Sequence, residues 1–348
     1  MIVVMKPDST QVELQNVINH VEELGLNAHL IQGEERTVVG VVGRTYPELM
    51  SMLSVHSGVD EVVPISKPYK LSGRDFIPDD TIITIRGVEI GGGRPVVMAG
   101  PCSVENEDML FETARATHAS GAHILRGGAY KPRTSPYQFR GLGEEGLKML
   151  HAAGRETGMP VITEVLTPQD VDLVAQYADI LQIGARNMQN YILLEEAGRS
   201  GKPVMLKRGL SGQIQEWLLC AEYIMAQGNR QVILCERGIR TFETMTRNTY
   251  DVTAIPLLKR LSHLPIVGDP SHGTGHWYLI EPMAMATIAA GADGLIIEVH
   301  PNPDHALSDG AQSLTFQSFD KMMQKAGTVA QAIGRPLHSA LEGELQVA

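Results

Sequence analysis

The stretch Pro95-Val96-Val97-Met98-Ala99-Gly100-Pro101-Cys102-Ser103 begins the repeating pattern that decides the fold. From here on, short apolar runs alternate with longer amphipathic segments such as 142–157, 215–227 and 282–290, a pattern typical of strand and helix units around a parallel sheet. Eight such runs recur, and no Gly-x-Gly-x-x-Gly follows the first, which favours a closed (β/α)8 TIM barrel over a doubly wound open sheet. The predicted strands are 96–99, 123–126, 161–165, 180–183, 204–207, 232–235, 266–268 and 295–299.

The first 66 residues follow a different pattern, in which short strands and helices give the order βαββαβ of a ferredoxin-like domain. A first helix should begin at Ser9 or Thr10 and end at Gly25. We predict that its buried face consists of Val12, Val17, Val21 and Leu24. The other predicted elements are strands at 2–5, 28–31, 37–42 and 59–65 and a helix at 47–53.

These patterns divide the chain into three parts. Residues 1–66 form the ferredoxin-like domain, residues 67–94 a linker with a hairpin that caps the barrel, and residues 95–340 the catalytic barrel. The linker is marked by Pro68, Gly73 and Pro78. A length of 348 residues suits this division, because a barrel needs roughly 250 residues.

Composition limits the class of protein. No apolar run reaches the roughly eighteen residues of a membrane span, and the amino terminus has no basic segment of a signal peptide. Three cysteines, an odd number, argue for a reducing compartment rather than a disulfide framework. We therefore expect a soluble cytoplasmic enzyme with no membrane partner. A net charge of -11 argues against nucleic-acid binding, which needs a cationic face.

Basic side chains gather where the predicted strands end, and barrel enzymes build their active sites at that face. Six positive charges at one mouth repel one another unless anions neutralise them, and guanidinium groups bind phosphate and carboxylate with two hydrogen bonds. The pattern predicts a polyanionic substrate; the alternative is that each residue is a solvated surface charge. The six are Arg126, Lys131, Arg133, Arg186, Lys207 and Arg237.

A second group combines a thiol, an imidazole and two carboxylates from the first, seventh and eighth strand ends and the loop beyond. These ends are neighbours in a closed barrel, so Cys102, His272, Glu298 and Asp309 can meet. Their mixed chemistry suits a divalent transition metal and leaves manganese, iron, cobalt and zinc open. Core packing is the alternative for a cysteine, and it fits Cys220 and Cys235 better.

Lys207 suggests a different kind of catalysis. A lysine beside Arg208 at a strand end is a candidate for Schiff-base chemistry, because neighbouring cations favour the neutral amine. The residues alone therefore leave a metal-free aldolase open.

Four motifs closely resemble the 3-deoxy-D-arabino-heptulosonate 7-phosphate (DAHP) synthase family, in the type Iβ branch with a ferredoxin-like N-terminal domain. The likeness covers essentially the whole chain. It implies a transferase that condenses phosphoenolpyruvate with erythrose 4-phosphate in the first step of the shikimate pathway of aromatic amino-acid biosynthesis. The motifs are Gly100-Pro101-Cys102, Lys131-Pro132-Arg133-Thr134-Ser135, Gly184-Ala185-Arg186 and Asp269-Pro270-Ser271-His272.

One motif bears on the choice of aldehyde. The sister family, which makes 3-deoxy-octulosonate 8-phosphate, has Ala-Asn-Arg where this chain has Pro132-Arg133. The difference points to the four-carbon aldehyde and leaves the octulosonate activity as the alternative.

The resemblance also implies a role for each matched residue. One divalent metal ion per subunit is expected on Cys102, His272, Glu298 and Asp309, with manganese the first choice and cobalt, iron, zinc and cadmium open. Cys102, His272 and Lys131 are the expected catalytic residues, with Lys131 as a proton donor to the nascent alkoxide. Phosphoenolpyruvate is expected to bind Arg126, Lys131, Glu164, Ala185, Arg186, Lys207 and Arg237. The phosphate of the aldose is expected to bind Arg133, Thr134 and Ser135. Asp269 is also expected to be a substrate-binding residue.

For the N-terminal domain the resemblance implies feedback inhibition by phenylalanine or tyrosine, and for the chain a homotetramer. His29 lies in an apolar strand and is the candidate effector contact. Leu30 and Ile31 offer no hydroxyl partner, so phenylalanine should bind at least as well as tyrosine. The alternatives are a structural cap or an oligomer interface, or a non-catalytic amino-acid sensor.

Overall fold

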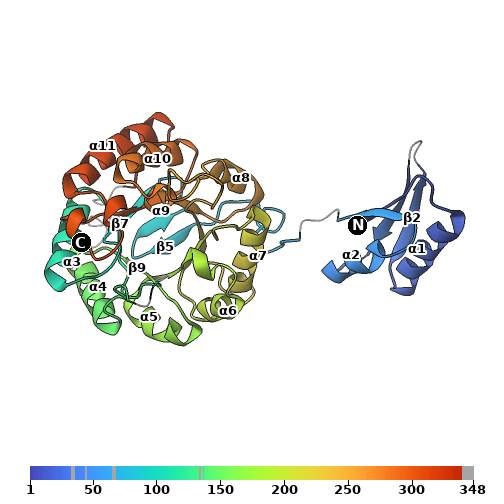
Figure 1. The fold of residues 1–348 in the computed structure, drawn as a ribbon, viewed down its shortest axis with the longest axis horizontal. Coiled ribbons are helices and arrows are strands. Elements are labelled where there is room, and N and C mark those ends of the chain that lie inside the picture. The colour runs from blue at the N-terminus through green and yellow to red at the C-terminus, as the bar shows by residue number, and fades with distance from the viewer. Residues whose placement is uncertain (33–35, 44, 65–67, 133–134, 136, 339–348) are drawn as a thin grey trace. The chain divides into compact units, whose positions relative to one another are not determined.

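The chain folds into two compact units, Met1–Pro68 and Tyr69–Ala348. Figure 1 draws both as ribbons. The computed structural model describes residues 1–32, 36–43, 45–64, 68–132, 135 and 137–338. Among these residues, no helix combines the length and the apolar character needed to cross a membrane.

The N-terminal unit has the ferredoxin-like order predicted above. Its antiparallel sheet has the strand order β2-β3-β1-β4, and Ile65, the predicted end of the last strand, lies outside the described residues. The elements are β1 (Ile2–Met5), α1 (Gln11–Glu23), β2 (Asn27–Gln32), β3 (Thr37–Val42), α2 (Pro47–Ser54) and β4 (Val59–Val63).

Helix α1 starts where the sequence predicted, and its buried face is confirmed at Val17 and Val21 but not at Val12. The Thr10 side chain accepts a hydrogen bond from the backbone of Glu13, whose carboxylate accepts one from the Thr10 backbone in return, which completes a capping box. The buried residues are Leu14, Val17 and Val21, while Val12 is 68% exposed. The prediction for Val12 was wrong because Leu14, Val17 and Val21 share one stripe of the helix, and Val12 is about half a turn away.

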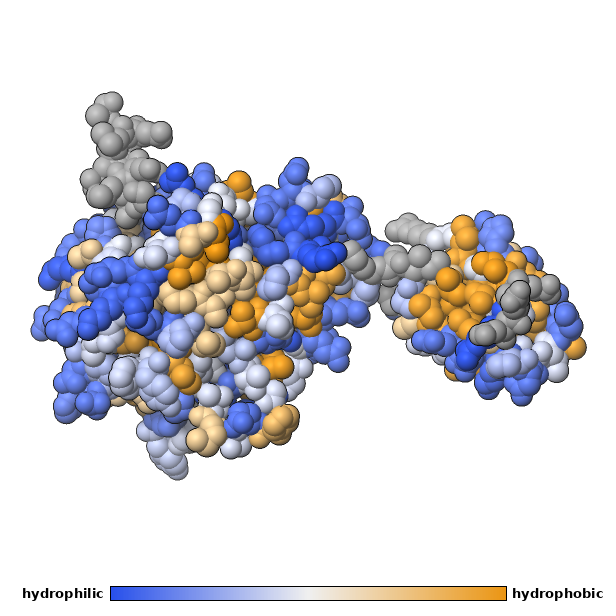
Figure 2. Space-filling model, turned by 90° about the horizontal axis from the view of Figure 1, so that it is seen from above, coloured by the Kyte–Doolittle hydropathy of each residue, from blue (hydrophilic) through white to orange (hydrophobic). Residues whose placement is uncertain are grey.

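The sheet of this unit has one face against the helices and one open face. Val39 and Val41 point into the core, so the alternating Val38, Gly40 and Val42 point to the other side. Figure 2 shows apolar residues gathered on the surface of this unit. His29 pairs with Gly40 and Ile31 with Val38, which places all four residues on the open face.

The second unit is the predicted barrel, closed by eight parallel strands. Each observed strand lies within two residues of its predicted range. The strands are β7 (Val96–Gly100), β8 (Ile124–Arg126), β9 (Val161–Glu164), β10 (Ile180–Ile183), β11 (Val204–Lys207), β12 (Val232–Glu236), β13 (Ile266–Gly268) and β14 (Gly294–Glu298).

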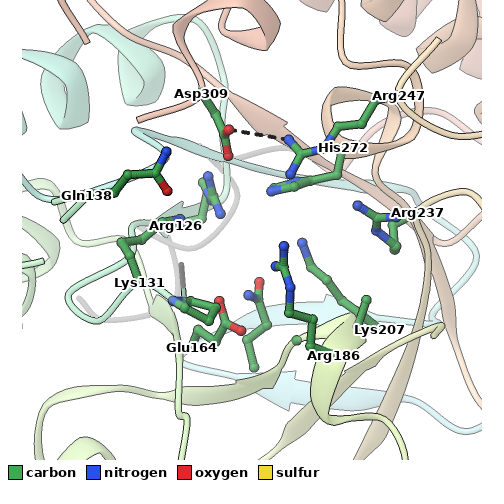
Figure 3. A pocket seen from close by; sticks show the side chains of 14 residues that line it. Arg126, Lys131, Gln138, Glu164, Arg186, Lys207, Arg237, Arg247, His272 and Asp309 are labelled. Carbon is green, nitrogen blue, oxygen red and sulfur yellow. Dashed lines mark ion pairs between the residues drawn. The ribbon is translucent and has the colours of Figure 1, made fainter. Parts of the chain in front are cut away.

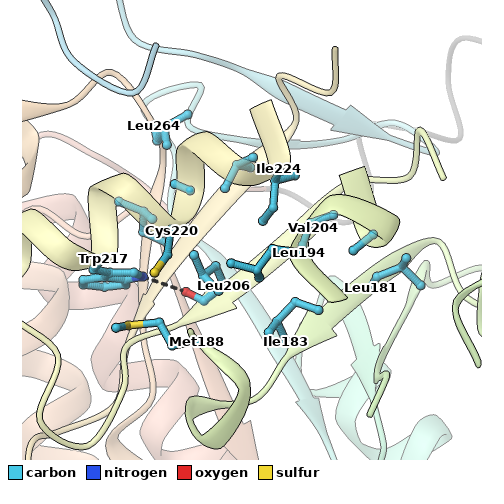
Figure 4. Close-up of a cluster of buried hydrophobic side chains, with 14 of the residues drawn as sticks. Leu181, Ile183, Met188, Leu194, Val204, Leu206, Trp217, Cys220, Ile224 and Leu264 are labelled. Carbon is cyan, nitrogen blue, oxygen red and sulfur yellow. Dashed lines mark hydrogen bonds between the residues drawn. The ribbon is translucent and has the colours of Figure 1, made fainter. Parts of the chain in front are cut away.

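Helices surround the barrel in Figure 1 and bury its outer face. In the core between strands and helices, Trp217 donates a hydrogen bond from its indole nitrogen to the Leu206 carbonyl at 3.1 Å, and Cys220 packs close by (Figure 4). The helices are α3 (Glu107–Ala119), α4 (Glu144–Thr157), α5 (Val171–Tyr177), α6 (Tyr191–Arg199), α7 (Ile214–Met225), α8 (Ala254–Leu261), α10 (Trp277–Ala289) and α11 (Phe316–Ala332), with the short α9 (Pro270–Thr274) after β13.

A hairpin of β5 (Ile83–Ile85) and β6 (Val88–Ile90) fills the amino-terminal end of the barrel. Its side chains Ile83, Ile85 and Ile90 are buried in one cluster with the innermost apolar layer of the strands. Cys235 belongs to the same cluster, so core packing is confirmed for both Cys220 and Cys235. The strand residues of this layer include Met98, Ile124, Ile162, Ile180, Met205, Ile233, Val267 and Ile296.

The alternation of side chains along each strand then positions the site. A residue two places after an inward apolar residue points inward again, one layer closer to the carboxyl end. At that layer the apolar residues give way to polar ones. Arg126 follows Ile124, Glu164 follows Ile162, Gln182 follows Ile180, Lys207 follows Met205 and Glu298 follows Ile296.

Candidate functional site

A cavity of about 230 Å³ opens at the carboxyl ends of the barrel strands (Figure 3). Among the fourteen described residues that line it, six are Arg or Lys and only two are carboxylates, so its wall is strongly cationic in a chain whose net charge is -11. The lining residues are Arg126, Lys131, Pro132, Gln138, Glu164, Gln182, Gly184, Ala185, Arg186, Lys207, Arg237, Arg247, His272 and Asp309.

The predicted cations largely meet in this cavity, and most of them are buried. Arg126, Lys131, Lys207 and Arg237 are each at most 8% exposed, which is incompatible with solvated surface charges. Arg186 is exposed and still lines the cavity.

The proposed aldose-phosphate residues are only partly described. Arg133 and Thr134 lie outside the described residues, so their predicted roles remain predictions. Ser135 is described, and it is not among the residues that line the cavity.

The buried cations are only partly neutralised by the chain itself. Arg126 donates to Glu298 at 2.8 Å and Lys207 pairs with Asp269 at 2.6 Å. Within the described residues, neither the buried Arg237 nor the exposed Arg186 forms an ion pair, and burial lowers the pKa of Arg237. The buried Nε of Arg126 has no hydrogen-bond partner there. Unpaired buried donors and cations are costly, so the cavity is built to receive anionic oxygens.

Three of the four predicted metal ligands converge beside this wall, and the fourth, His272, lies against one of them. Ligand atoms of Cys102, Glu298 and Asp309 all lie within 4.8 Å of one another. The Cys102 thiol lies 3.3 Å from an Asp309 oxygen, and His272 Nε2 lies 3.4 Å from Glu298 Oε1. Glu298 is the last residue of β14, and His272 lies in the short helix α9. Asp309 comes from the loop that follows β14.

The charges of this group favour a bound cation. Burial, and then the charge of Glu298, raises the pKa of the Cys102 thiol to about 12. Burial acts to raise the pKa of Asp309, but Arg247 and His272 outweigh it and lower that pKa. The buried Glu298 carboxylate and the partly buried Asp309 carboxylate lie beside a buried thiol whose ionisation is opposed by burial, and a divalent ion would stabilise the thiolate. The residues present therefore fit a metal site.

His272 is held in the orientation that a ligand needs. Its Nδ1 lies 2.7 Å from Asp269 Oδ2, its backbone carbonyl accepts from Asn248, and Nε2 is left facing Glu298. Burial lowers the pKa of His272, which favours the neutral imidazole that binds metals. Burial opposes ionisation of Asp269, but His272 and Lys207 hold its pKa well below the usual range.

Lys131 lies next to the thiol. Its Nζ donates to the Cys102 carbonyl and to Cys102 Sγ, each at 3.0 Å. Burial acts to lower the pKa of Lys131, but the interactions with Cys102 and Glu298 outweigh burial and raise it. A side chain at Gly128 would come within 2.8 Å of both Lys131 and the Cys102 carbonyl, so this close approach requires glycine.

The remaining predicted residues Glu164 and Ala185 both line the cavity, and burial raises the pKa of Glu164. Three polar residues that line the cavity, Gln138, Gln182 and Arg247, were not predicted. Strand alternation would have found Gln182, which follows the inward Ile180. Gln138 and Arg247 lie in loops, where no periodic signal exists.

Comparisons with known proteins agree with the geometry. The profile of the DAHP synthetase I family matches residues 78–333, and that of the DAHP synthase ferredoxin-like domain matches residues 1–67. A phospho-2-dehydro-3-deoxyheptonate aldolase of Thermotoga maritima is 51% identical over 334 residues, which cover 96% of this chain and 99% of that protein.

Two further matches place the chain among its relatives. A crystal structure of the Thermotoga maritima phospho-2-dehydro-3-deoxyheptonate aldolase (DAHP synthase) superimposes with a TM-score of 0.93 at 50% identity and covers 97% of this chain and 99% of that one. A 2-dehydro-3-deoxyphosphooctonate aldolase of Syntrophobacter fumaroxidans is 32% identical and covers 69% of this chain and 89% of its own length.

Proposed function

Because the chain belongs to the DAHP synthetase I family, we propose that it condenses phosphoenolpyruvate with D-erythrose 4-phosphate to DAHP and phosphate in a metal-dependent reaction. One observation carries the proposal: a cavity wall with six Lys or Arg side chains lies beside a thiol, an imidazole and two carboxylates. Phosphoenolpyruvate brings a phosphate and a carboxylate, and the aldose brings a second phosphate, so the substrates supply the anions that this wall lacks.

The cations divide into two kinds. Arg126 and Lys207 are already paired with Glu298 and Asp269, which holds their side chains in place. Arg186 and Arg237 have no acidic partner among the described residues, and we assign them to the oxygens of phosphoenolpyruvate. Ala185 and Glu164 complete the same wall.

Cys102, His272, Glu298 and Asp309 would hold one divalent ion, with manganese the first choice. When bound, the ion supplies Lewis-acid polarisation of the aldehyde oxygen of erythrose 4-phosphate. C3 of phosphoenolpyruvate forms the new bond to the aldehyde carbon, water adds at C2, and phosphate leaves. Lys131, buried and protonated beside Cys102, gives its proton to the nascent alkoxide oxygen.

The two alternatives have weaker support. A Schiff-base lysine must present a free amine to its substrate, but Nζ of Lys207 is already engaged by Asp269 Oδ2 at 2.6 Å. The octulosonate activity is carried by relatives at 32% identity, against 51% for the heptonate relative.

Incubation with phosphoenolpyruvate, erythrose 4-phosphate and Mn²⁺, with and without a chelator, distinguishes a metal-dependent synthase from a Schiff-base aldolase and from a non-catalytic sensor. We expect both substrates to disappear together, with release of one phosphate, and a chelator to stop the reaction reversibly. Arabinose 5-phosphate in place of erythrose 4-phosphate should react far more slowly. Trapping of Lys207 by borohydride would instead indicate a Schiff base, and no reaction with either aldose would indicate a sensor.

For the N-terminal domain we propose binding of an aromatic amino acid on the open sheet face. Gly40 has no side chain, and His29 and Ile31 flank the space above it. Ile31 is 54% exposed and offers only apolar contact. Phenylalanine should therefore inhibit at least as strongly as tyrosine in a titration of initial rates, and a strict preference for tyrosine would contradict this assignment.

The family resemblance also supports a homotetramer in the cytoplasm, and light scattering on the purified protein tests that assembly.

A further inference from the structure

A buried amide lies behind the two carboxylates of the proposed metal site. Gln312 ends the 3-10 helix η4 (Gly310–Gln312) and is 2% exposed. Its Nε2 donates to Glu298 Oε2 at 2.6 Å, and its Oε1 accepts from Arg247 Nη1 at 2.5 Å. A donor faces a carboxylate and an acceptor faces a guanidinium, so only one orientation of the amide satisfies both partners.

This amide completes the support of Glu298. The other oxygen, Oε1, accepts from Arg126 at 2.8 Å and lies 3.4 Å from His272 Nε2. Both oxygens of the Glu298 carboxylate are therefore held, one by Arg126 and one by Gln312. Without the amide, the carboxylate could rotate about its side-chain torsions and would no longer present a fixed oxygen to its neighbours.

The same contacts reach Asp309. Arg247 donates to Gln312 and lies 3.4 Å from Asp309 Oδ1, so Gln312 and Arg247 connect the two carboxylates through one buried amide. The backbone of this segment is fixed as well: Leu314 N donates to the Glu298 carbonyl at 2.9 Å, and Gln312 N to the Asp309 carbonyl at 3.2 Å. The segment is thus rigidly attached to the end of β14.

We infer that Gln312 is a positioning residue that sets the affinity of the site for its divalent ion by fixing the Glu298 carboxylate. The inference rests on the proposed function, since it presupposes that the site holds a metal. A neutral amide suits this position, because it donates to the carboxylate without adding a positive charge that would repel the ion. Replacement of such outer partners of metal ligands typically weakens metal binding about 10–100-fold.

The test uses Gln312→Met in the full-length protein, because methionine keeps the length of the side chain and removes both hydrogen bonds. Titration of the metal-free proteins with Co²⁺, followed by visible absorption, gives the dissociation constant and the d–d bands that report coordination geometry. We expect the dissociation constant to rise about 10–100-fold and the d–d bands to shift.

The matched control is Gln324→Met. Gln324 also donates to a carboxylate, Asp320 at 2.8 Å, but on the exposed surface of α11, so its loss should leave Co²⁺ binding unchanged. If Gln312→Met does not fold, Gln312→Asn keeps the amide but is too short to reach both partners, and the same loss of affinity is expected.

The outcomes are distinct. Equal Co²⁺ affinity and unchanged d–d bands in wild type and the Gln312 variant would overturn the inference. Failure of the wild-type protein to bind Co²⁺ would instead overturn the metal-dependent function on which the inference rests.

Discussion

Cys102→Ala should lose metal-dependent turnover altogether. The thiol is 2% exposed, lies within 4.8 Å of ligand atoms of Glu298 and Asp309, and receives a hydrogen bond from Lys131. Its removal deletes a donor of the proposed site. Replacing a residue that only supports a ligand typically weakens metal affinity by at most about 100-fold. Removing a ligand itself should weaken it more. The measurements are the Mn²⁺ dissociation constant and the rate of phosphate release at saturating Mn²⁺.

The control for this prediction is Cys220→Ala. Cys220 is equally buried, but it packs in the apolar core between α7 and the strands. Its replacement leaves a small cavity and should lower stability without changing metal affinity. A Cys102→Ala protein that folds, binds Mn²⁺ as tightly as wild type and turns over at the wild-type rate would contradict the assignment of the thiol as a ligand.

Lys131→Met should lower kcat by about 100- to 10,000-fold, the usual contribution of a positioned general acid. Its ammonium group is 3.0 Å from Cys102 Sγ, and the neighbouring Cys102 and Glu298 raise its pKa against the effect of burial, so the group carries a proton at neutral pH. Methionine has a similar length and no proton to give. Because Lys131 also lines the substrate cavity, KM for phosphoenolpyruvate should rise as well.

Lys148→Met is the matched control for the lysine. Lys148 pairs with Glu144 and Glu145 on the exposed surface of α4, and such pairs contribute little to stability. The steady-state constants of this variant should equal those of wild type. Full kcat in Lys131→Met at saturating substrates would remove Lys131 as the proton donor.

Much of the barrel could be predicted because the strands are buried on both faces. Runs such as Val204–Lys207 are almost purely apolar up to the last residue, so both their position and the switch to polar chemistry are visible in the sequence. The helix α1 was harder, because Val12 and Leu14 are both apolar and only packing decides which one faces the sheet.

The residues of the site also differ in how well the sequence predicts them. Residues on strands or directly after them, such as Arg126, Lys207 and Glu298, were predictable because closure of the barrel brings strand ends together. Arg247 lies in a loop and Gln312 ends the short helix η4, and their meeting depends on the path of two segments 65 positions apart. No spacing rule predicts such a contact, although it connects the two carboxylates of the site.

We propose above all that one divalent ion lies on Cys102, His272, Glu298 and Asp309 beside a pocket for phosphoenolpyruvate. Anomalous diffraction from crystals grown with Mn²⁺ and phosphoenolpyruvate tests it most directly. We predict a single strong anomalous peak within coordinating distance of all four side chains, with the phosphate and carboxylate of phosphoenolpyruvate on Arg186 and Arg237. A Mn²⁺ peak elsewhere, with Cys102 and His272 uncoordinated, would contradict the account.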